Sequence, residues 1–269
     1  MKLSVFYHHI AEASKQTGKP VHEILSYVKS IGIDYAEIDL NDIADSDRIF
    51  FMLDRADMKI SSIYGFYNFT QTPDGTPGYR HIDLAAEYGA EKIMIIPGFY
   101  TSSDENIHFK ERENMIISTY QMCQYAEKKN IIPTIEDFDD FNSPLADAEG
   151  MLRFLNTIPQ LKVTFDTGNF MYSGQDELHA FELLKDRICH VHCKDRSLDA
   201  SARGESKATV DGKKMYPSPV GDGCIKIKDI VEKLNGMGYD GIYTIEHFGT
   251  ETQLDYITKS VNNLKGWLK

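Results

Sequence analysis

The sequence lacks both a long apolar run and an excess of positive charge. No apolar segment approaches the ~20 residues that a membrane-spanning helix requires, and the opening segment MKLSVFYHHIAEASKQ is a poor signal peptide. The 29 basic residues are outnumbered by 41 acidic ones, which gives a formal net charge of −12. Because such a chain repels a phosphate backbone, we expect no nucleic acid among its partners, and the lack of a long apolar run leads us to expect no membrane.

Cysteine is also scarce, with four residues at positions 123, 189, 193 and 224. Their spacing matches neither a CxxC pair nor a zinc knuckle, so we predict reduced, buried thiols in a cytoplasmic protein. The phosphate-binding patterns GxxxxGKS/T and strand-following GxGxxG are absent too, and a phosphorylated substrate is therefore not indicated.

The sequence does contain a regular alternation of short β-like runs and helical stretches. Hydrophobic residues make up 42% of the chain, which is enough for a sizeable core. The expected strands are 3–8, 35–40, 59–64, 92–97, 132–138, 162–168, 188–195 and 241–248. The expected helices are 21–31, 46–55, 80–88, 105–129, 146–157, 176–185, 227–237 and 252–268. Eight β-then-α units in strict order predict one α/β domain over residues 1–269, a (β/α)₈ TIM barrel, whose usual length is ~250 residues.

Two connections in this pattern are unusually long. Residues 66–78 follow the third strand, and residues 196–223 follow the seventh strand and are rich in Ser, Gly and Lys. Both leave the carboxyl ends of strands, where barrels build their active sites. We predict that segment 196–223 extends over the active-site face; whether it covers the site or contacts a second copy in a homo-oligomer stays open.

The seventh strand shows which side chains enter the barrel. Side chains alternate between the two faces of a strand, and one face of a barrel strand meets the helices. In ICHVHCKD the apolar Cys-Val-Cys set must face the helices. The other set therefore points inward: His190, His192 and Lys194.

The same alternation directs a carboxylate inward near the end of three further strands, at Glu136, Asp166 and Glu246. Three carboxylates in one small cavity repel each other and are costly to bury, and a divalent cation resolves both problems. With His192 they predict a single site that favours Mn²⁺ or Mg²⁺ and also suits Co²⁺ or Zn²⁺. The alternative is four separate salt-bridged residues on the barrel rim.

Six motifs resemble the xylose isomerase-like superfamily of sugar isomerases and epimerases, dehydratases and endonuclease IV. They are IGIDYAEID, TIED, FDTGN, HVHCKD, VGDG and YTIEH, and they span nearly the whole chain. The resemblance implies that Glu136, Asp166, His192 and Glu246 are metal ligands and that the two glutamates also move a substrate proton. It places Lys194 and Glu37 near the substrate.

One position departs from the family pattern. The group commonly has Asp-x-x-His in the sixth strand, whereas this chain has Asn169 as the fourth residue. We keep Asn169 as a substrate contact, and its identity disfavours mechanisms that need a histidine there. It also disfavours the endonuclease activity, which uses that histidine.

Further candidates have two interpretations each. Lys194 either steadies a developing oxyanion as a catalytic group or pairs with Glu136 or Asp195. His190 is a hydrogen-bonded core residue or a substrate contact. His8, expected at the end of the first strand, and Tyr64 in the third strand either form the pocket wall or have a structural role.

These residues favour a metal-dependent isomerase or epimerase of a sugar, polyol or keto sugar, acting by proton transfer through an enediolate. One alternative is a metal-dependent dehydratase of the inosose or dehydroshikimate type, because elimination begins with the same proton removal. A second alternative is a non-catalytic barrel that binds metal or sugar. The sugar-like substrate rests on the resemblance.

Overall fold

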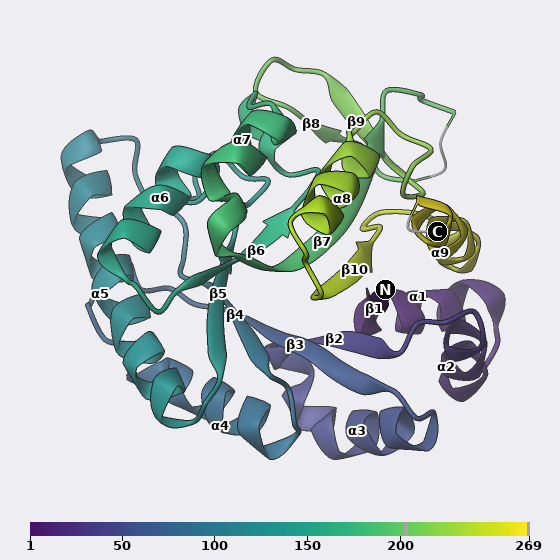
Figure 1. Ribbon diagram of the computed structural model, residues 1–269. Coiled ribbons are helices and arrows are strands. Elements are labelled where there is room, and N and C mark those ends of the chain that lie inside the picture. The colour runs from purple at the N-terminus through teal and green to yellow at the C-terminus, as the bar shows by residue number, and fades with distance from the viewer. Residues whose placement is uncertain (202–203, 268–269) are drawn as a thin grey trace.

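The chain closes into a barrel of parallel strands surrounded by helices (Figure 1). The computed structural model describes residues 1–201 and 204–267. Within them, eight strands follow the order β1–β2–β3–β4–β5–β6–β7–β10, and β10 pairs with β1 to complete the circle. The predicted (β/α)₈ TIM barrel is therefore confirmed.

Each predicted strand and helix is present, with ends close to the predicted ones. The barrel strands are β1 (Lys2–Phe6), β2 (Tyr35–Asp39), β3 (Lys59–Phe66), β4 (Lys92–Ile96), β5 (Ile132–Glu136), β6 (Lys162–Asp166), β7 (Ile188–Ser197) and β10 (Ile242–Glu246). The helices are α1 (Tyr7–Thr17), α2 (Val21–Ser30), α3 (Ser46–Arg55), α4 (Tyr79–Glu87), α5 (Glu105–Lys128), α6 (Ala148–Thr157), α7 (Glu177–Leu184), α8 (Ile227–Gly236) and α9 (Gln253–Trp267). Residue 268, the predicted end of the last helix, lies outside the described residues.

Among the α-helices of the described residues, α1 is the one that the sequence pattern did not predict. We expected a strand over 3–8, but β1 ends at Phe6 and the helix begins at Tyr7, so His8 lies on a helix. Phe6 occupies the N-cap position and makes no side-chain capping hydrogen bond, so no Ser, Thr, Asp or Asn marked the boundary. Gly18 ends the helix with a left-handed φ of 71°, a conformation that glycine adopts without strain.

Segment 196–223 contains a β-hairpin rather than an irregular loop. Strand β7 continues to Ser197 and pairs antiparallel with β9 (Lys214–Ser218), which in turn pairs with β8 (Lys207–Ala208). Asp195 anchors the return of the segment, because its carboxylate accepts hydrogen bonds from the backbone N–H groups of Gly221 at 2.8 Å and Gly223 at 3.0 Å. The VGDG motif therefore holds this segment in place.

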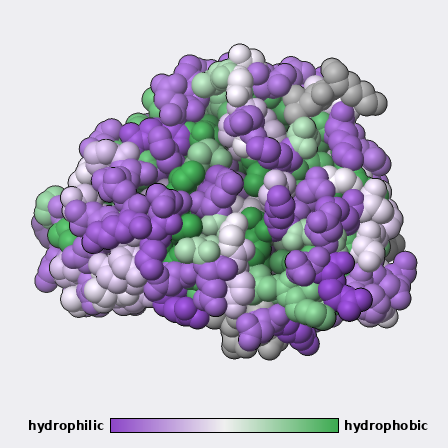
Figure 2. Space-filling model, turned by 60° about the horizontal axis from the view of Figure 1, so that its bottom comes forward, coloured by the Kyte–Doolittle hydropathy of each residue, from purple (hydrophilic) through white to green (hydrophobic). Residues whose placement is uncertain are grey.

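Two hydrophobic clusters divide the interior. The large one packs the helices onto the outer face of the barrel, and the small one, Phe6, Tyr64, Met94 and Ile96, lies inside the barrel mouth. On the face of the molecule in Figure 2, hydrophilic residues cover most of the surface and hydrophobic ones appear in separate groups. None of the described helices is long and apolar enough to cross a membrane.

The four cysteines are free thiols, as predicted, but not all of them are buried. Cys123 and Cys193 are fully buried, and burial raises the pKa of both thiols. Cys224 is exposed, so the prediction of a buried thiol is wrong there. It lies in the turn that follows Gly223, where the backbone rather than the side chain makes the tertiary contact, from Cys224 N to Arg196 O at 2.8 Å.

Candidate metal centre at the mouth of the barrel

Four acidic and imidazole side chains meet where β5, β6, β7 and β10 end. Glu136, Asp166, His192 and Glu246 each offer one ligand atom, these atoms lie within 4.8 Å of one another, and all four residues are buried. The strand register brings them together, because Asp166 lies opposite His192 across the β6–β7 pair. The structure thus gathers the four predicted ligands into one cluster.

Asp166 is held by the turn that follows its strand. Its Oδ1 accepts hydrogen bonds from the backbone N–H groups of Gly168 at 2.7 Å and Asn169 at 2.8 Å. A Cβ at position 168 would meet the backbone oxygen of Lys194, so glycine lets this turn lie against β7. The other carboxylate oxygen, Oδ2, is buried and has no hydrogen-bond partner. A buried acceptor without a donor is costly, which suits a site built to receive a cation.

His192 sits between carboxylates on both sides. Its Nδ1 contacts Glu136 Oε1 and lies 3.4 Å from Glu246 Oε2, while its Nε2 lies 3.0 Å from Glu37 Oε2. Burial alone would lower the pKa of this imidazole, but Glu37 and Glu136 outweigh burial and raise it well above its usual value. Nδ1 faces two of the other candidate ligands, Glu136 and Glu246, and is therefore the ring nitrogen placed to bind a metal ion.

The electrostatics of the carboxylates are also those of groups that a cation would stabilise in the charged form. Burial and the nearby charge of Glu246 raise the pKa of Asp166 well above its usual value. Burial likewise raises the pKa of Glu136. A divalent cation reverses this effect because it favours the charged form of every ligand. The donor set of three carboxylates and one imidazole fits a divalent metal, as the unpaired oxygen of Asp166 does.

Lys194 is the ammonium beside this cluster. Its Nζ lies 2.8 Å from Glu246 Oε1 and 3.4 Å from Asp139 Oδ2. The predicted pairing with Glu136 or Asp195 is therefore wrong, because Asp195 turns away to bind the backbone of segment 196–223. Burial works to raise the pKa of Glu246, but Lys194 and His192 hold it well below its usual value.

A cavity of about 320 Å³ opens above the cluster. Its polar lining is His8, Asp39, Glu136, Asp139, Asn169, Lys194 and Glu246, and its apolar lining is Phe6, Tyr64, Phe66, Met94, Ile96, Phe138 and Phe248. This volume lies at the small end of the ~300–1,000 Å³ that small-molecule sites usually have. Aromatic rings therefore form one part of the wall and charged groups the other.

The predicted substrate contacts divide into two groups. His8, Tyr64, Asn169 and Lys194 line the cavity, and His8 does so from α1, where its Nε2 lies 3.3 Å from Glu12 Oε1. Asn169 donates from Nδ2 to the backbone oxygen of Asp137 at 2.8 Å, while its buried Oδ1 has no partner.

Glu37 and His190 form the second group and do not line the cavity. Both are fully buried beneath His192, and His190 Nε2 lies 2.9 Å from Glu37 Oε2. This placement agrees with the interpretation of His190 as a hydrogen-bonded core residue. It puts Glu37 below the four candidate metal ligands rather than in the wall of the cavity.

Sequence reasoning missed Asp139 and Asp39, which also line the cavity. Asp39 has the same strand parity as Glu37, so the alternation of side chains pointed to it. Asp139 follows the predicted end of the fifth strand, where the alternation no longer applies. Its role depends on the hairpin, because Lys207 Nζ lies 2.7 Å from Asp139 Oδ1.

Comparison with known proteins settles the family. The profile of the family described as xylose isomerase-like TIM barrel matches residues 25–267. The chain belongs to this family. Among curated relatives of this xylose isomerase-like chain is an inosose dehydratase of Geobacillus thermodenitrificans, 33% identical over 91 residues. That alignment covers 32% of this chain and 30% of the dehydratase, so it does not transfer the activity of the whole enzyme.

Solved structures of similar shape share the barrel. An L-ribulose 3-epimerase superposes with a TM-score of 0.74 over 100% of this chain and 95% of that protein, at 16% identity. A xylose isomerase-like TIM barrel protein from Mycobacterium smegmatis, in complex with magnesium, gives a TM-score of 0.68 over 92% of this chain and 87% of that protein, also at 16% identity. At such identity these likenesses concern the fold of this xylose isomerase-like chain alone.

Proposed function

We propose that this protein is a divalent-metal-dependent isomerase or epimerase of a small, uncharged keto sugar or polyol ketone. The observation that supports this most directly is the convergence of Glu136, Asp166, His192 and Glu246 at the floor of a small cavity. Two of these residues, Glu136 and Glu246, also line the cavity, so a carboxylate can reach the substrate from β5 and another from β10.

Mn²⁺ and Mg²⁺ suit the cluster best because three of its four ligands are carboxylates, and Co²⁺ or Zn²⁺ are the alternatives. The magnesium complex of the Mycobacterium smegmatis relative is in keeping with this preference. A bound divalent cation supplies Lewis-acid polarisation of a substrate carbonyl oxygen, which acidifies the neighbouring C–H bond.

The two glutamates remove a proton from the substrate and return one to it. One carboxylate accepts the proton from the hydroxyl-bearing carbon next to the carbonyl, and a protonated carboxylate returns one proton to the substrate. Return to the opposite face of the same carbon inverts its configuration. Return to the former carbonyl carbon, with a proton shift between the two oxygens, moves the carbonyl to its neighbour.

Charge and polarity of the cavity favour an uncharged polyhydroxy substrate. Among the described lining residues Lys194 is the one ammonium, and it is already paired with Glu246 and Asp139. A substrate carboxylate or phosphate would find no free cation there beyond the metal. The unpartnered Oδ1 of Asn169 is an acceptor for a hydroxyl group, and the aromatic rings suit the C–H surface of a sugar.

A dehydratase is the second candidate, supported by the similarity to inosose dehydratase. After the same proton removal, the hydroxyl on the next carbon leaves as water when a protonated group donates to it. Because the one lining ammonium, Lys194, is already paired with carboxylates, the cavity favours an uncharged inosose over a carboxylate such as dehydroshikimate as the substrate of this reaction.

Incubation in D₂O with Mn²⁺ and a panel of keto sugars and inososes tests the proposal. We expect deuterium at one carbon of the recovered sugar, and an unsaturated ketone instead if the protein is a dehydratase. Glu246→Gln should abolish the exchange, and Asp240→Asn, the same chemical change at the opposite end of the barrel, should not. Metal-loaded protein that exchanges no substrate proton contradicts the proposal and indicates a non-catalytic binding barrel.

A further inference from the structure

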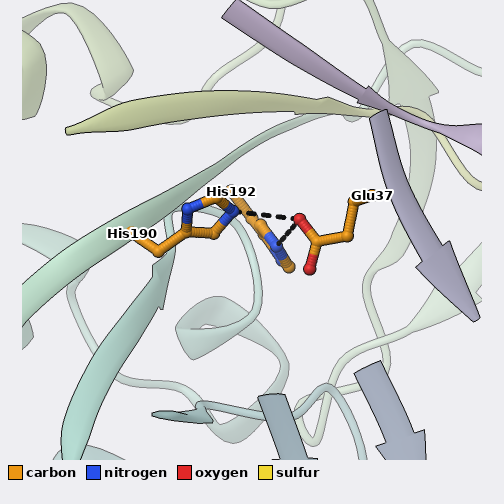
Figure 3. Close-up of side chains that lie close together, drawn as sticks. All are labelled: Glu37, His190 and His192. Carbon is orange, nitrogen blue, oxygen red and sulfur yellow. Dashed lines mark hydrogen bonds and ion pairs between the residues drawn. The ribbon is translucent and has the colours of Figure 1, made fainter. Parts of the chain in front are cut away.

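A second polar cluster lies directly beneath the metal centre, inside the barrel (Figure 3). Glu37 reaches in from β2, and His190 and His192 reach in from β7, and the side chains of all three are fully buried. Glu37 Oε2 lies 2.9 Å from His190 Nε2 and 3.0 Å from His192 Nε2. Thr244 on β10 donates to the same oxygen at 3.2 Å. One carboxylate oxygen thus contacts two imidazole nitrogens and one hydroxyl group.

His192 belongs to both clusters and uses a different ring nitrogen in each. Its Nδ1 faces Glu136 and Glu246 in the metal centre, and its Nε2 faces Glu37. A neutral imidazole carries one N–H and one lone pair, and the partner of one nitrogen decides which is which. An ionised carboxylate accepts a hydrogen bond and cannot donate one. With a cation bound between Nδ1 and the carboxylates of Glu136 and Glu246, Glu37 is the acceptor that holds the N–H at Nε2, and the lone pair of Nδ1 faces the cation.

We propose that Glu37 is a positioning residue that holds His192 in the tautomer and orientation required of a metal ligand. The inference rests on the proposed metal site and deepens it. Ligating histidines commonly donate their second N–H to a carboxylate, and loss of that partner typically weakens metal binding ~10–100-fold. His190 and Thr244 hold Glu37 from behind, which gives His190 a role away from the substrate.

The same three residues also satisfy the spacing of a second metal site. Such a site would need the lone pair of His192 Nε2 while Nδ1 serves the first site, so the ring would have to lose its remaining proton. The hydrogen bond to Glu37 requires no such loss and accounts for the observed contacts. The geometry therefore favours one metal ion with an outer carboxylate over two metal ions.

Titration of the purified protein with Mn²⁺ tests this, with the number of bound ions and the dissociation constant as readouts. We expect one ion per chain in the wild type, and a dissociation constant ~10–100-fold higher in Glu37→Gln, which keeps the shape but loses the charge. Thr134→Val is the control: it removes two buried hydrogen bonds of Thr134 Oγ1, to Ile93 O at 3.0 Å and with Thr164 Oγ1 at 2.8 Å, and neither involves His192. It should bind Mn²⁺ within about twofold of the wild type.

The outcomes distinguish failure of the proposed metal site from failure of the proposed role of Glu37. A wild type that binds no ion removes the proposed metal site itself. If the wild type binds one ion and Glu37→Gln binds it equally tightly, the proposed metal site stands and the proposed role of Glu37 is refuted. Two ions in the wild type and one in the variant refute it in favour of a second metal site.

A measurement on the wild type keeps the inference testable even if Glu37→Gln fails to fold. In the protein loaded with diamagnetic Zn²⁺, ¹⁵N NMR of the His192 ring should show the metal at Nδ1 and a proton, slow to exchange with water, at Nε2. A metal-bound Nε2 would overturn the assignment. Neither readout depends on catalysis.

Discussion

At the scale of single residues, the carboxylates of the site surround one imidazole, that of His192, and one ammonium group, that of Lys194. His192 and Lys194 are neighbours on the inward face of β7, and each contacts Glu246. Lys194 also contacts Asp139, so it neutralises one carboxylate of the metal centre and one of the cavity wall. Among the described residues that line the cavity, Lys194 is the only lysine or arginine.

Replacement of Lys194 by methionine separates two roles of this charge. If the ammonium stabilises a developing substrate oxyanion, Lys194→Met should lower kcat by ~10²–10³, the usual effect of losing one such donor. Metal affinity should not fall, because removal of a nearby positive charge favours binding of a cation. Exchange kinetics in D₂O and a Mn²⁺ titration of the same sample measure both. A kcat within about threefold of the wild type would show that Lys194 only balances charge.

At the scale of elements, the carboxyl end of β7 and segment 196–223 shape the site together. The hairpin of β8 and β9 brings Lys207 to Asp139, and the return of the segment is bound to the Asp195 carboxylate. Gly223 lies so close that a Cβ there would collide with Asp195 Oδ1 and with the backbone oxygen of Arg196. This glycine is therefore required by space rather than by backbone conformation.

Gly223→Ala should lower the free energy of unfolding by roughly 1–3 kcal/mol, the usual cost of overpacking a closed contact. Gly236→Ala is the matched control, because a Cβ at Gly236 meets nothing within 4 Å and the residue ends α8. Alanine in a helix is more stable than glycine by roughly 0.5–1 kcal/mol, so this variant should be neutral or slightly stabilised. Denaturant unfolding of both variants gives the comparison. If the two variants have equal free energies of unfolding, the turn at Gly223 accommodates a Cβ without loss of stability.

Some of these elements and side chains could be predicted from the sequence, and others could not. Strand alternation placed four side chains in the barrel because the period of two is strict where one face meets the helices. It missed α1 because β1 runs into the helix without a capping side chain. Asp139 was not predicted because it follows the end of β5, where strand alternation no longer applies. Glu37 was expected near the substrate from the family resemblance, which did not give the depth of its side chain in the barrel.

At the scale of the whole molecule, the metal centre depends on the last strand of the barrel. Strand β10 pairs with β7, which brings Glu246 to His192, and it pairs with β1, which completes the circle. Figure 1 shows α1, which follows the first strand, next to α9. The four ligands come from four strands that are adjacent in space, and segments far apart in the sequence therefore build one site.

A Mn²⁺ titration of the wild type and of Asp166→Asn tests the central claim most directly. The variant keeps the size of the side chain and an acceptor for Gly168 and Asn169, but loses the charge of the unpartnered oxygen. We expect one tightly bound ion per chain in the wild type and a dissociation constant at least about 100-fold higher in the variant, since loss of a direct ligand should exceed the ~10–100-fold of an outer one. A wild type that binds no divalent ion, or a variant that binds it equally well, would contradict the account.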